Sequence, residues 1–227
     1  MNTLKKKSIF QPFEPILFFA AYFLPGYLGQ NETVNPEVFN NFIFNISFSL
    51  TALGQIFLLY YMLSLKKTYS LTDYGIVKIK IMDIPRILLL CGGIFLCMLP
   101  FSLIQMLSPE ESVPYFMNPV EWKITNPAMI PLIFITCICT GYREESFFRS
   151  YMLTLMSQKN LPVFLSVLCS TILFSAGHAY QGLLGLAGTA LIGIFLSIIF
   201  IKTKNLHTIA IAHGLYNFIT LMISIDF

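Results

Sequence analysis

Long runs of apolar residues, bounded by charged or turn residues, divide the chain into seven segments. A run of about 20 apolar residues predicts a helix that crosses a membrane, because a helix of that length matches the hydrocarbon thickness. The first run contains Glu14, Pro15 and Pro25 and is not followed by a small-residue cleavage site, so we expect a kinked, retained span. The runs cover residues 10–28, 42–65, 87–107, 129–156, 161–179, 183–201 and 208–225.

This pattern predicts an all-α, polytopic bundle of seven transmembrane helices, or eight if the fourth run is split. Residues 1–227 would then form a single integral membrane domain in contact with membrane lipids. Composition agrees, because 56% of the residues are hydrophobic and only 11% are charged, whereas a soluble domain carries about 25% charged residues. The composition excludes a soluble enzyme, a disordered chain and a disulfide scaffold.

Basic residues predict the orientation of these helices. With a cytoplasmic N-terminus, eleven basic residues lie on the cytoplasmic side and only Lys123 lies outside. This excess is the positive-inside pattern, and it predicts a cytoplasmic N-terminus in a multi-pass protein of the cell membrane. The net charge of +3 follows from this asymmetry. No loop interleaves basic and aromatic residues, so we expect no nucleic-acid partner.

Charged residues inside a membrane span are costly and usually functional. Here four of them fall within seven residues of the fourth run, from Arg143 to Arg149. Glu145 and Arg149 are four residues apart and can pair on one helix face. The side chain of Glu144 points about 100° away around the helix axis, so we expect it to stay unpaired and available for another role. The alternative is a loop between two shorter helices, with all four charges in solvent.

Two later runs each contribute a histidine. His178 lies near the end of the fifth run, and His213 and Asn217 share one face of the last. Taken singly, each has a structural interpretation, either as a helix-end residue or as a hydrogen bond between helices. Taken together with Glu144, they supply the base, the proton donor and the oxyanion donors that amide hydrolysis requires.

The order Glu-Glu-x-x-x-Arg, Phe-x-x-x-His and His-x-x-x-Asn resembles the CPBP family. This family comprises the type II CAAX prenyl endopeptidases and the bacteriocin-processing intramembrane proteases, and it is also called the Abi family. The motifs stand at residues 144–149, 174–178 and 213–217. The resemblance defines a protease core at about residues 129–225, whereas the first three spans match only as generic membrane helices.

The resemblance implies a role for each residue of the motifs. Glu144 would activate the attacking water, and His178 would hold that water and shuttle its proton. His213 and Asn217 would stabilise the oxyanion. Supporting residues around them would orient the site, and these are Glu145, Arg149 and Phe174.

Zinc is an alternative, because the family was long described as metalloproteases. Glu144, His178 and His213 could supply three ligands and leave a fourth position open. However, the carboxamide of Asn217 is a poor zinc ligand, and the structural picture of the family implies a metal-independent site. The sequence therefore favours a site without a metal or another cofactor.

The resemblance implies an intramembrane endopeptidase that cuts a membrane-embedded or lipidated peptide. Bacterial relatives imply bacteriocin immunity, pheromone processing or the regulation of a membrane sensor kinase. The alternative is a non-catalytic membrane partner of a sensor kinase or bacteriocin receptor, in which the polar cluster only joins helices. A transporter with a proton relay is a third interpretation, but the chain lacks an inverted repeat.

Helix depth presents a difficulty for this site. Counted from the cytoplasmic ends of the runs, Glu144, His178 and His213 lie at depths of roughly 18, 27 and 8 Å. Side chains that meet cannot differ so much in depth. The count therefore predicts either that the fifth helix extends beyond Ala179, or that the boundaries are wrong by a turn or more.

Overall fold

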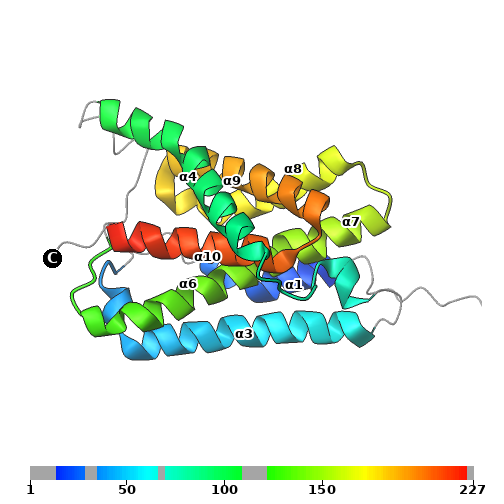
Figure 1. Ribbon diagram of the computed structural model, residues 1–227, viewed down its shortest axis with the longest axis horizontal. Coiled ribbons are helices and arrows are strands. Elements are labelled where there is room, and N and C mark those ends of the chain that lie inside the picture. Colours follow the sequence, from blue (N-terminus) through cyan, green and yellow to red (C-terminus); the bar gives the residue numbers. More distant parts are fainter. Residues whose placement is uncertain (1–13, 29–34, 66–69, 109–121, 224–227) are drawn as a thin grey trace, which may run out of the picture.

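A computed structural model of the chain describes residues 14–28, 35–65, 70–108 and 122–223. Every regular element in these ranges is helical, so the predicted all-α class is confirmed (Figure 1). Residues 10–13 and 224–225 of the first and last predicted runs lie outside the described ranges. The main helices are α1 (Glu14–Tyr22), α2 (Leu24–Leu28), α3 (Phe42–Leu65), α4 (Asp83–Leu107), α6 (Ile130–Glu145), α7 (Thr154–Gln158), α8 (Val163–Ala176), α9 (Gly182–Thr203) and α10 (Leu206–Ile223).

The predicted number of spans is not confirmed. Within the described ranges, four helices are long and apolar enough to cross a membrane, namely α3, α4, α10 and the segment Ala179–Thr203 that contains α9. The other predicted runs form shorter or interrupted helices. For example, α8 has 14 residues and rises only about 21 Å, against a hydrocarbon thickness of about 30 Å. The fifth apolar run, residues 161–179, is longer than its helix α8, whereas α4 and α9 extend beyond their runs.

The kink predicted in the first run is present. Helix α1 ends at Tyr22 and α2 begins at Leu24, which leaves Phe23 outside both. Pro25 accounts for this break, because proline lacks an N–H and its ring clashes with the carbonyl four residues earlier, here that of Ala21. The chain therefore turns at the point where it approaches the centre of the bundle.

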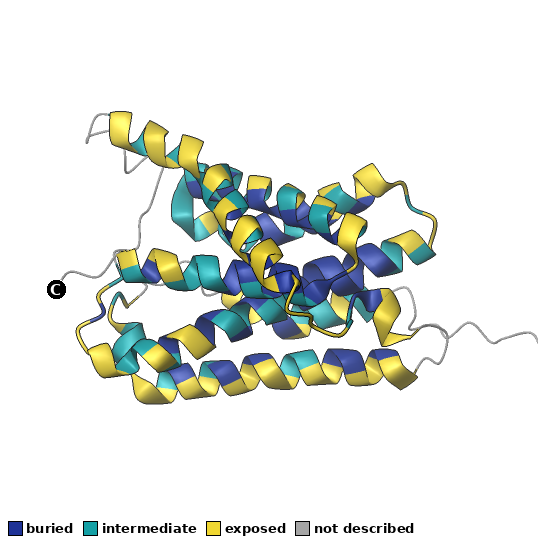
Figure 2. Ribbon diagram, viewed as in Figure 1, coloured by how far each residue is buried: buried dark blue, intermediate teal, exposed yellow. Residues whose placement is uncertain are grey.

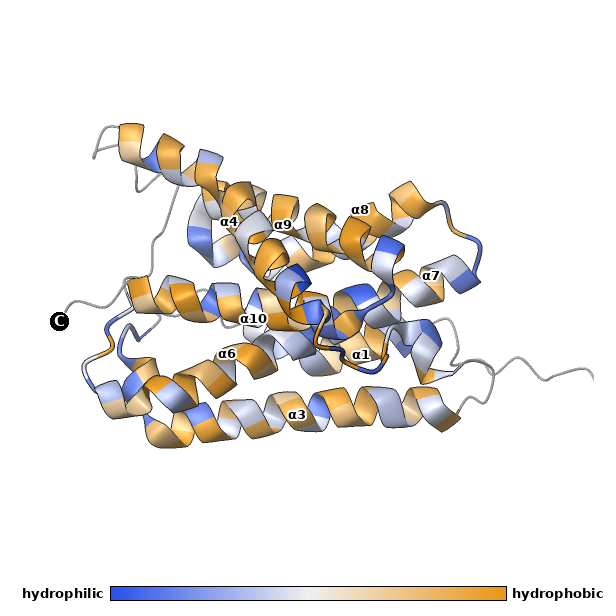
Figure 3. Ribbon diagram, in the orientation of Figure 1, coloured by the Kyte–Doolittle hydropathy of each residue, from blue (hydrophilic) through white to orange (hydrophobic). Residues whose placement is uncertain are grey.

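The outer faces of the long helices are apolar. Ile43 and Phe57 on α3, and Leu89 and Leu96 on α4, are each at least 69% exposed. The exposed side of these helices in Figure 2 also carries hydrophobic residues in Figure 3. Such faces are unfavourable in water and match lipid tails. The surface therefore supports a membrane protein.

The charged stretch of the fourth run is helical throughout. Helix α6 continues without a break into a π-helical segment, η5 (Ser146–Leu153), and then into α7. All eight residues of η5 are buried. The predicted alternative of a solvated loop is therefore wrong, and an eighth span made by splitting this run is not confirmed. π-Helical turns often occur at functional sites.

Helices α6 and α10 pack with their backbones in contact. A Cβ atom on Gly141 would lie 2.5 Å from the carbonyl oxygen of Ala210, and one on Gly214 would lie 2.8 Å from Cα of Ile138. Only glycine allows this approach, as in other close helix pairs of membrane proteins. Because Gly214 adjoins His213, the contact places that histidine beside the end of α6.

The structure also resolves the depth difficulty. Helix α8 ends at Ala176, so the predicted extension beyond Ala179 is wrong. Instead, α10 begins inside the protein, where Leu206 is only 2% exposed. In Figure 1, α10 starts nearer the centre of the molecule than the ends of α3 and α7. Because the helices do not start at one common level, the depths counted from their ends cannot be compared. For this reason the depth counted for His213 was too small.

Candidate active site

A cavity of about 1000 Å³ lies among α2, α3, α6, α9 and α10. The four residues predicted to be catalytic come from three separate parts of the chain, and all four line this cavity. They are Glu144 at the end of α6, His178 just after α8, and His213 and Asn217 on α10. The structure therefore brings together the residues that the motifs select.

Glu145 and Arg149 form the pair that their spacing predicts. Both side chains are fully buried, and Nη1 of Arg149 donates to Oε1 of Glu145 over 2.9 Å. The same carboxylate oxygen lies 2.8 Å from Nδ1 of His213. Because an ionised carboxylate only accepts hydrogen bonds, Nδ1 of His213 carries a proton and donates it. Glu145 thus fixes the orientation of the His213 ring.

Arg149 joins three helices through its guanidinium group. It lies over the ring of Phe174 on α8, with 4.2 Å between the guanidinium carbon and the ring centroid. Its Nη2 donates to the carbonyl of Gly193 on α9 over 3.5 Å. Phe174 in turn packs edge-on against the ring of His213, with 5.9 Å between centroids. The supporting residues therefore hold the imidazole from two sides.

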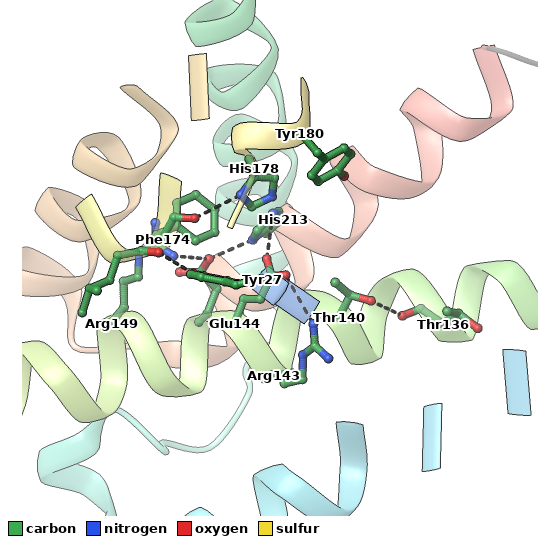
Figure 4. A network of polar contacts seen from close by, with 12 residues as sticks. Tyr27, Thr136, Thr140, Arg143, Glu144, Arg149, Phe174, His178, Tyr180 and His213 are labelled. Atoms are coloured by element: carbon green, nitrogen blue, oxygen red, sulfur yellow. Dashed lines mark hydrogen bonds and ion pairs between the residues drawn. The ribbon is translucent and has the colours of Figure 1, made fainter. Parts of the chain in front are cut away.

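Glu144 stands between two nitrogen-bearing groups without being bound tightly to either. Its Oε2 lies 3.8 Å from Nε2 of His213, and its Oε1 lies 3.7 Å from Nη2 of Arg143 (Figure 4). Both distances exceed a hydrogen bond. Glu144 is also partly exposed to the cavity, whereas Glu145 is fully buried. Its oxygens therefore remain able to accept a proton from a group in the cavity.

His178 presents one defined nitrogen to the site. Its Nδ1 lies 3.1 Å from the carbonyl oxygen of Phe174, one helical turn earlier. Because a carbonyl only accepts, this contact places the proton on Nδ1, and in the neutral ring it leaves a lone pair on Nε2. The ring also lies nearly parallel to that of Tyr180, with 6.5 Å between centroids. His178 is thereby suited to accept a hydrogen bond from water.

Asn217 lies one helical turn beyond His213, on the same face of α10, and its side chain borders the cavity. A carboxamide carries two N–H donors. Together with His213 it can present N–H groups toward one point of the cavity, which is the arrangement that an oxyanion needs. The roles of these residues in oxyanion binding stay predictions.

The sequence did not predict two aromatic residues of the cavity wall, Tyr27 and Tyr180. Tyr27 comes from α2, and its hydroxyl donates to the carbonyl of Leu173. A Cβ atom on Gly177 would lie 2.6 Å from the Tyr27 ring, so this ring covers the turn that carries His178. The only local signal was the proline break just before Tyr27, which marks a turn and says nothing of the contact partner.

The zinc alternative requires three ligands in one place. Among the residues that the structure describes, no three side chains of His, Cys, Asp or Glu form such a group. Glu145, the acid nearest to His213, is already engaged by Arg149. The absence of a metal from this site therefore stays a prediction.

Residues 126–219 match a family model described as type II CAAX prenyl endopeptidase Rce1-like. This match contains all three motifs, and it confirms the resemblance found from them. It covers less than half of the chain and leaves α1 to α4 outside. No curated protein and no solved structure matches the chain.

Proposed function

We propose, from this similarity to CAAX-type endopeptidases, that the protein is an intramembrane protease that hydrolyses a membrane-associated or lipidated peptide. One observation carries the proposal. Glu144, His178, His213 and Asn217 come from three separate segments and line one cavity in a bundle whose outer faces are apolar. Buried polar groups are costly in such a setting, and a merely structural cluster has no need to border a cavity.

The proposed reaction begins with a water held by Glu144 and His178. Glu144 accepts one proton from that water, and the oxygen forms a new bond to the carbonyl carbon of the peptide. The electron pair of the carbonyl moves to its oxygen, which becomes the oxyanion. His178 then carries this proton from Glu144 to the amide nitrogen. The electron pair of the oxyanion re-forms the carbonyl as the C–N bond breaks, and the amine leaves. No step passes through a metal.

His213 and Asn217 would stabilise the oxyanion in this reaction. Because Nδ1 of His213 already donates to Glu145, Nε2 can donate to the oxyanion only when both ring nitrogens carry protons. The Glu145 carboxylate would balance the charge of that form. Asn217 would add a neutral N–H donor from the same helix face. The supporting carboxylate thus takes part in the chemistry through His213.

The proposal includes the setting of the enzyme. We place it in a bacterial cell membrane, because the chain is rich in Lys, Ile, Phe and Asn. We place its N-terminus in the cytoplasm, because basic residues are concentrated on that side of the predicted spans. Bacteriocin immunity, pheromone processing and sensor-kinase regulation are the roles that the family resemblance suggests. A non-catalytic membrane partner would keep such a role without the chemistry of Glu144.

Two substitutions test the protease. Glu144→Gln and His178→Ala should each abolish cleavage of a membrane-peptide library, as followed by mass spectrometry on protein confirmed in the membrane. Glu37→Gln is the matched control, because Glu37 is exposed and lies outside the cavity. Full cleavage by both site variants would refute the proposed mechanism, whereas an intact host phenotype without cleavage would favour the non-catalytic partner.

A further inference from the structure

Among the residues that the structure describes, Arg143 is the one charged residue of the cavity wall that the proposed reaction does not use. It directly precedes Glu144 and lines the same cavity. Its guanidinium carbon lies 5.3 Å from the ring centroid of Phe23 and 5.0 Å from that of Phe48. These two rings, from the break between α1 and α2 and from α3, hold the cation in place. Figure 4 shows the guanidinium beside Glu144.

The hydrogen-bond donors of Arg143 are largely unused. Its closest carboxylate is that of Glu144, and the 3.7 Å between Nη2 and Oε1 is longer than a hydrogen bond. Its Nε is buried and has no hydrogen-bond partner within the described part of the chain. By contrast, Arg149 makes a 2.9 Å bond to Glu145. A buried N–H without a hydrogen-bond partner is unfavourable. The Arg143 guanidinium therefore needs an acceptor that the described residues do not supply.

We propose that Arg143 forms a carboxylate-binding subsite for the substrate, an inference that rests on the proposed protease function. A guanidinium has five N–H donors and can face two acceptors along different edges. Arg143 can therefore approach Glu144 with one edge and bind a substrate carboxylate with another. In this role it is a specificity-determining residue, because it selects the peptide rather than reacting with it.

The position of Arg143 limits where that carboxylate stands in the peptide. The guanidinium lies within 4 Å of Glu144, and one extended residue spans about 3.3–3.6 Å. The carboxylate therefore belongs to a residue next to the scissile bond or one residue beyond it. Two sources share this chemistry, a free C-terminus and an Asp or Glu side chain. If the carboxylate is that of a free C-terminus, the product released from this end of the peptide is one or two residues long.

The remaining cavity wall indicates what surrounds the acid. Aromatic residues cluster at the part of the wall that contains Trp122, where the ring of Phe39 lies 5.0 Å from that of Trp122 and 6.0 Å from that of Phe44. Such a wall favours apolar side chains beside the carboxylate. Phe23 and Phe48 both precede residues 126–219, so the two rings that hold Arg143 lie outside the family match.

Binding can be measured without turnover, because Trp122 is the single tryptophan and lines the cavity. The full chain in detergent would be titrated with three N-acetylated apolar tetrapeptides while Trp122 fluorescence is recorded. One peptide ends in a free acid, one ends in an amide, and one ends in an amide but carries Glu before its last residue. We expect one charged peptide to bind about 10- to 100-fold more tightly than the neutral one.

Variants of Arg143 separate recognition from structure. Arg143→Gln should remove the preference for the charged peptide and leave binding of the neutral amide unchanged, and Arg143→Lys should restore part of the preference. The charged peptide that binds more tightly than the neutral one identifies the ligand, which is either the free C-terminus or the acidic side chain. If Arg143→Gln does not fold, the three peptides on the wild-type protein decide the question alone.

Two results would overturn the subsite. One is that the wild-type protein binds neither charged peptide more tightly than the neutral one, and the other is that Arg143→Gln weakens charged and neutral peptides equally. The proposed protease function fails separately. A protein that prefers the charged peptide but never cuts any peptide would refute the protease, whereas cleavage without that preference would refute only the subsite.

Discussion

Oε1 of Glu145 lies 2.8 Å from Nδ1 of His213, which joins two helices across 68 residues of sequence. The same oxygen accepts from Arg149 over 2.9 Å. One buried carboxylate therefore connects a cation, which ties together α6, α8 and α9, with the imidazole that faces the cavity. This relationship makes the second glutamate of the pair a positioning residue for His213.

Replacing Glu145 with Gln should lower kcat about 10- to 100-fold, with little change in KM. The carboxamide cannot balance a doubly protonated His213 as a carboxylate does, so the oxyanion would lose a donor. Steady-state cleavage of a peptide identified from the library measures this effect. Glu37→Gln, at an exposed site, is the control, and a wild-type kcat in Glu145→Gln would contradict the role assigned here.

Replacing Arg149 with Ala should destabilise the protein by about 3–5 kcal/mol, because it leaves the Glu145 carboxylate buried and unpaired. Arg149→Lys should restore stability only in part, since lysine lacks the planar group that lies over Phe174. Unfolding in detergent, followed by circular dichroism, measures both. Arg86→Ala is the matched control, because Arg86 also pairs with an acid but is 68% exposed. Equal stability of Arg149→Ala and wild type would mean that the pair is not structural.

Replacing Gly141 with Ala should separate α6 from α10 and abolish activity. The added methyl would lie 2.5 Å from the backbone carbonyl of Ala210, which cannot move aside as a side chain can. Gly92→Ala and Gly54→Ala are controls within helices, because a Cβ atom at either position meets nothing within 4 Å. These controls should be neutral or slightly stabilising, since alanine favours helix. Cleavage rate and unfolding temperature of the three variants form the test, and an active Gly141→Ala would refute the close packing.

Extensive washing with a chelator should leave cleavage unchanged, because the proposed reaction needs no metal. The measurement pairs an activity assay with the metal content of the purified protein. Equimolar zinc in the washed wild-type protein, lost in His178→Ala, would overturn this expectation. It would also reassign His178 from water binding to metal binding.

The site residues could be selected from the sequence because their signals are local. Charged residues between Arg143 and Arg149 stand out within an apolar run, and the spacing of Glu145 and Arg149 places them on one helix face whatever the rest of the fold does. The histidine motifs are weaker signals when taken singly, and their order, which resembles that of a known family, selects them. Their meeting in one cavity could only be assumed, and the depth count argued against it.

The sequence by itself determined the helical class and, through the resemblance to a known family, the three motifs. The length of an apolar run and the cost of charge within it act inside single segments. Only the tertiary structure decided which partners those segments meet. The buried start of α10 brings His213 to the level of Glu144, and the break at Phe23 brings an aromatic ring to Arg143. Helix lengths and offsets fix such contacts, and neither is encoded in the composition of any one run.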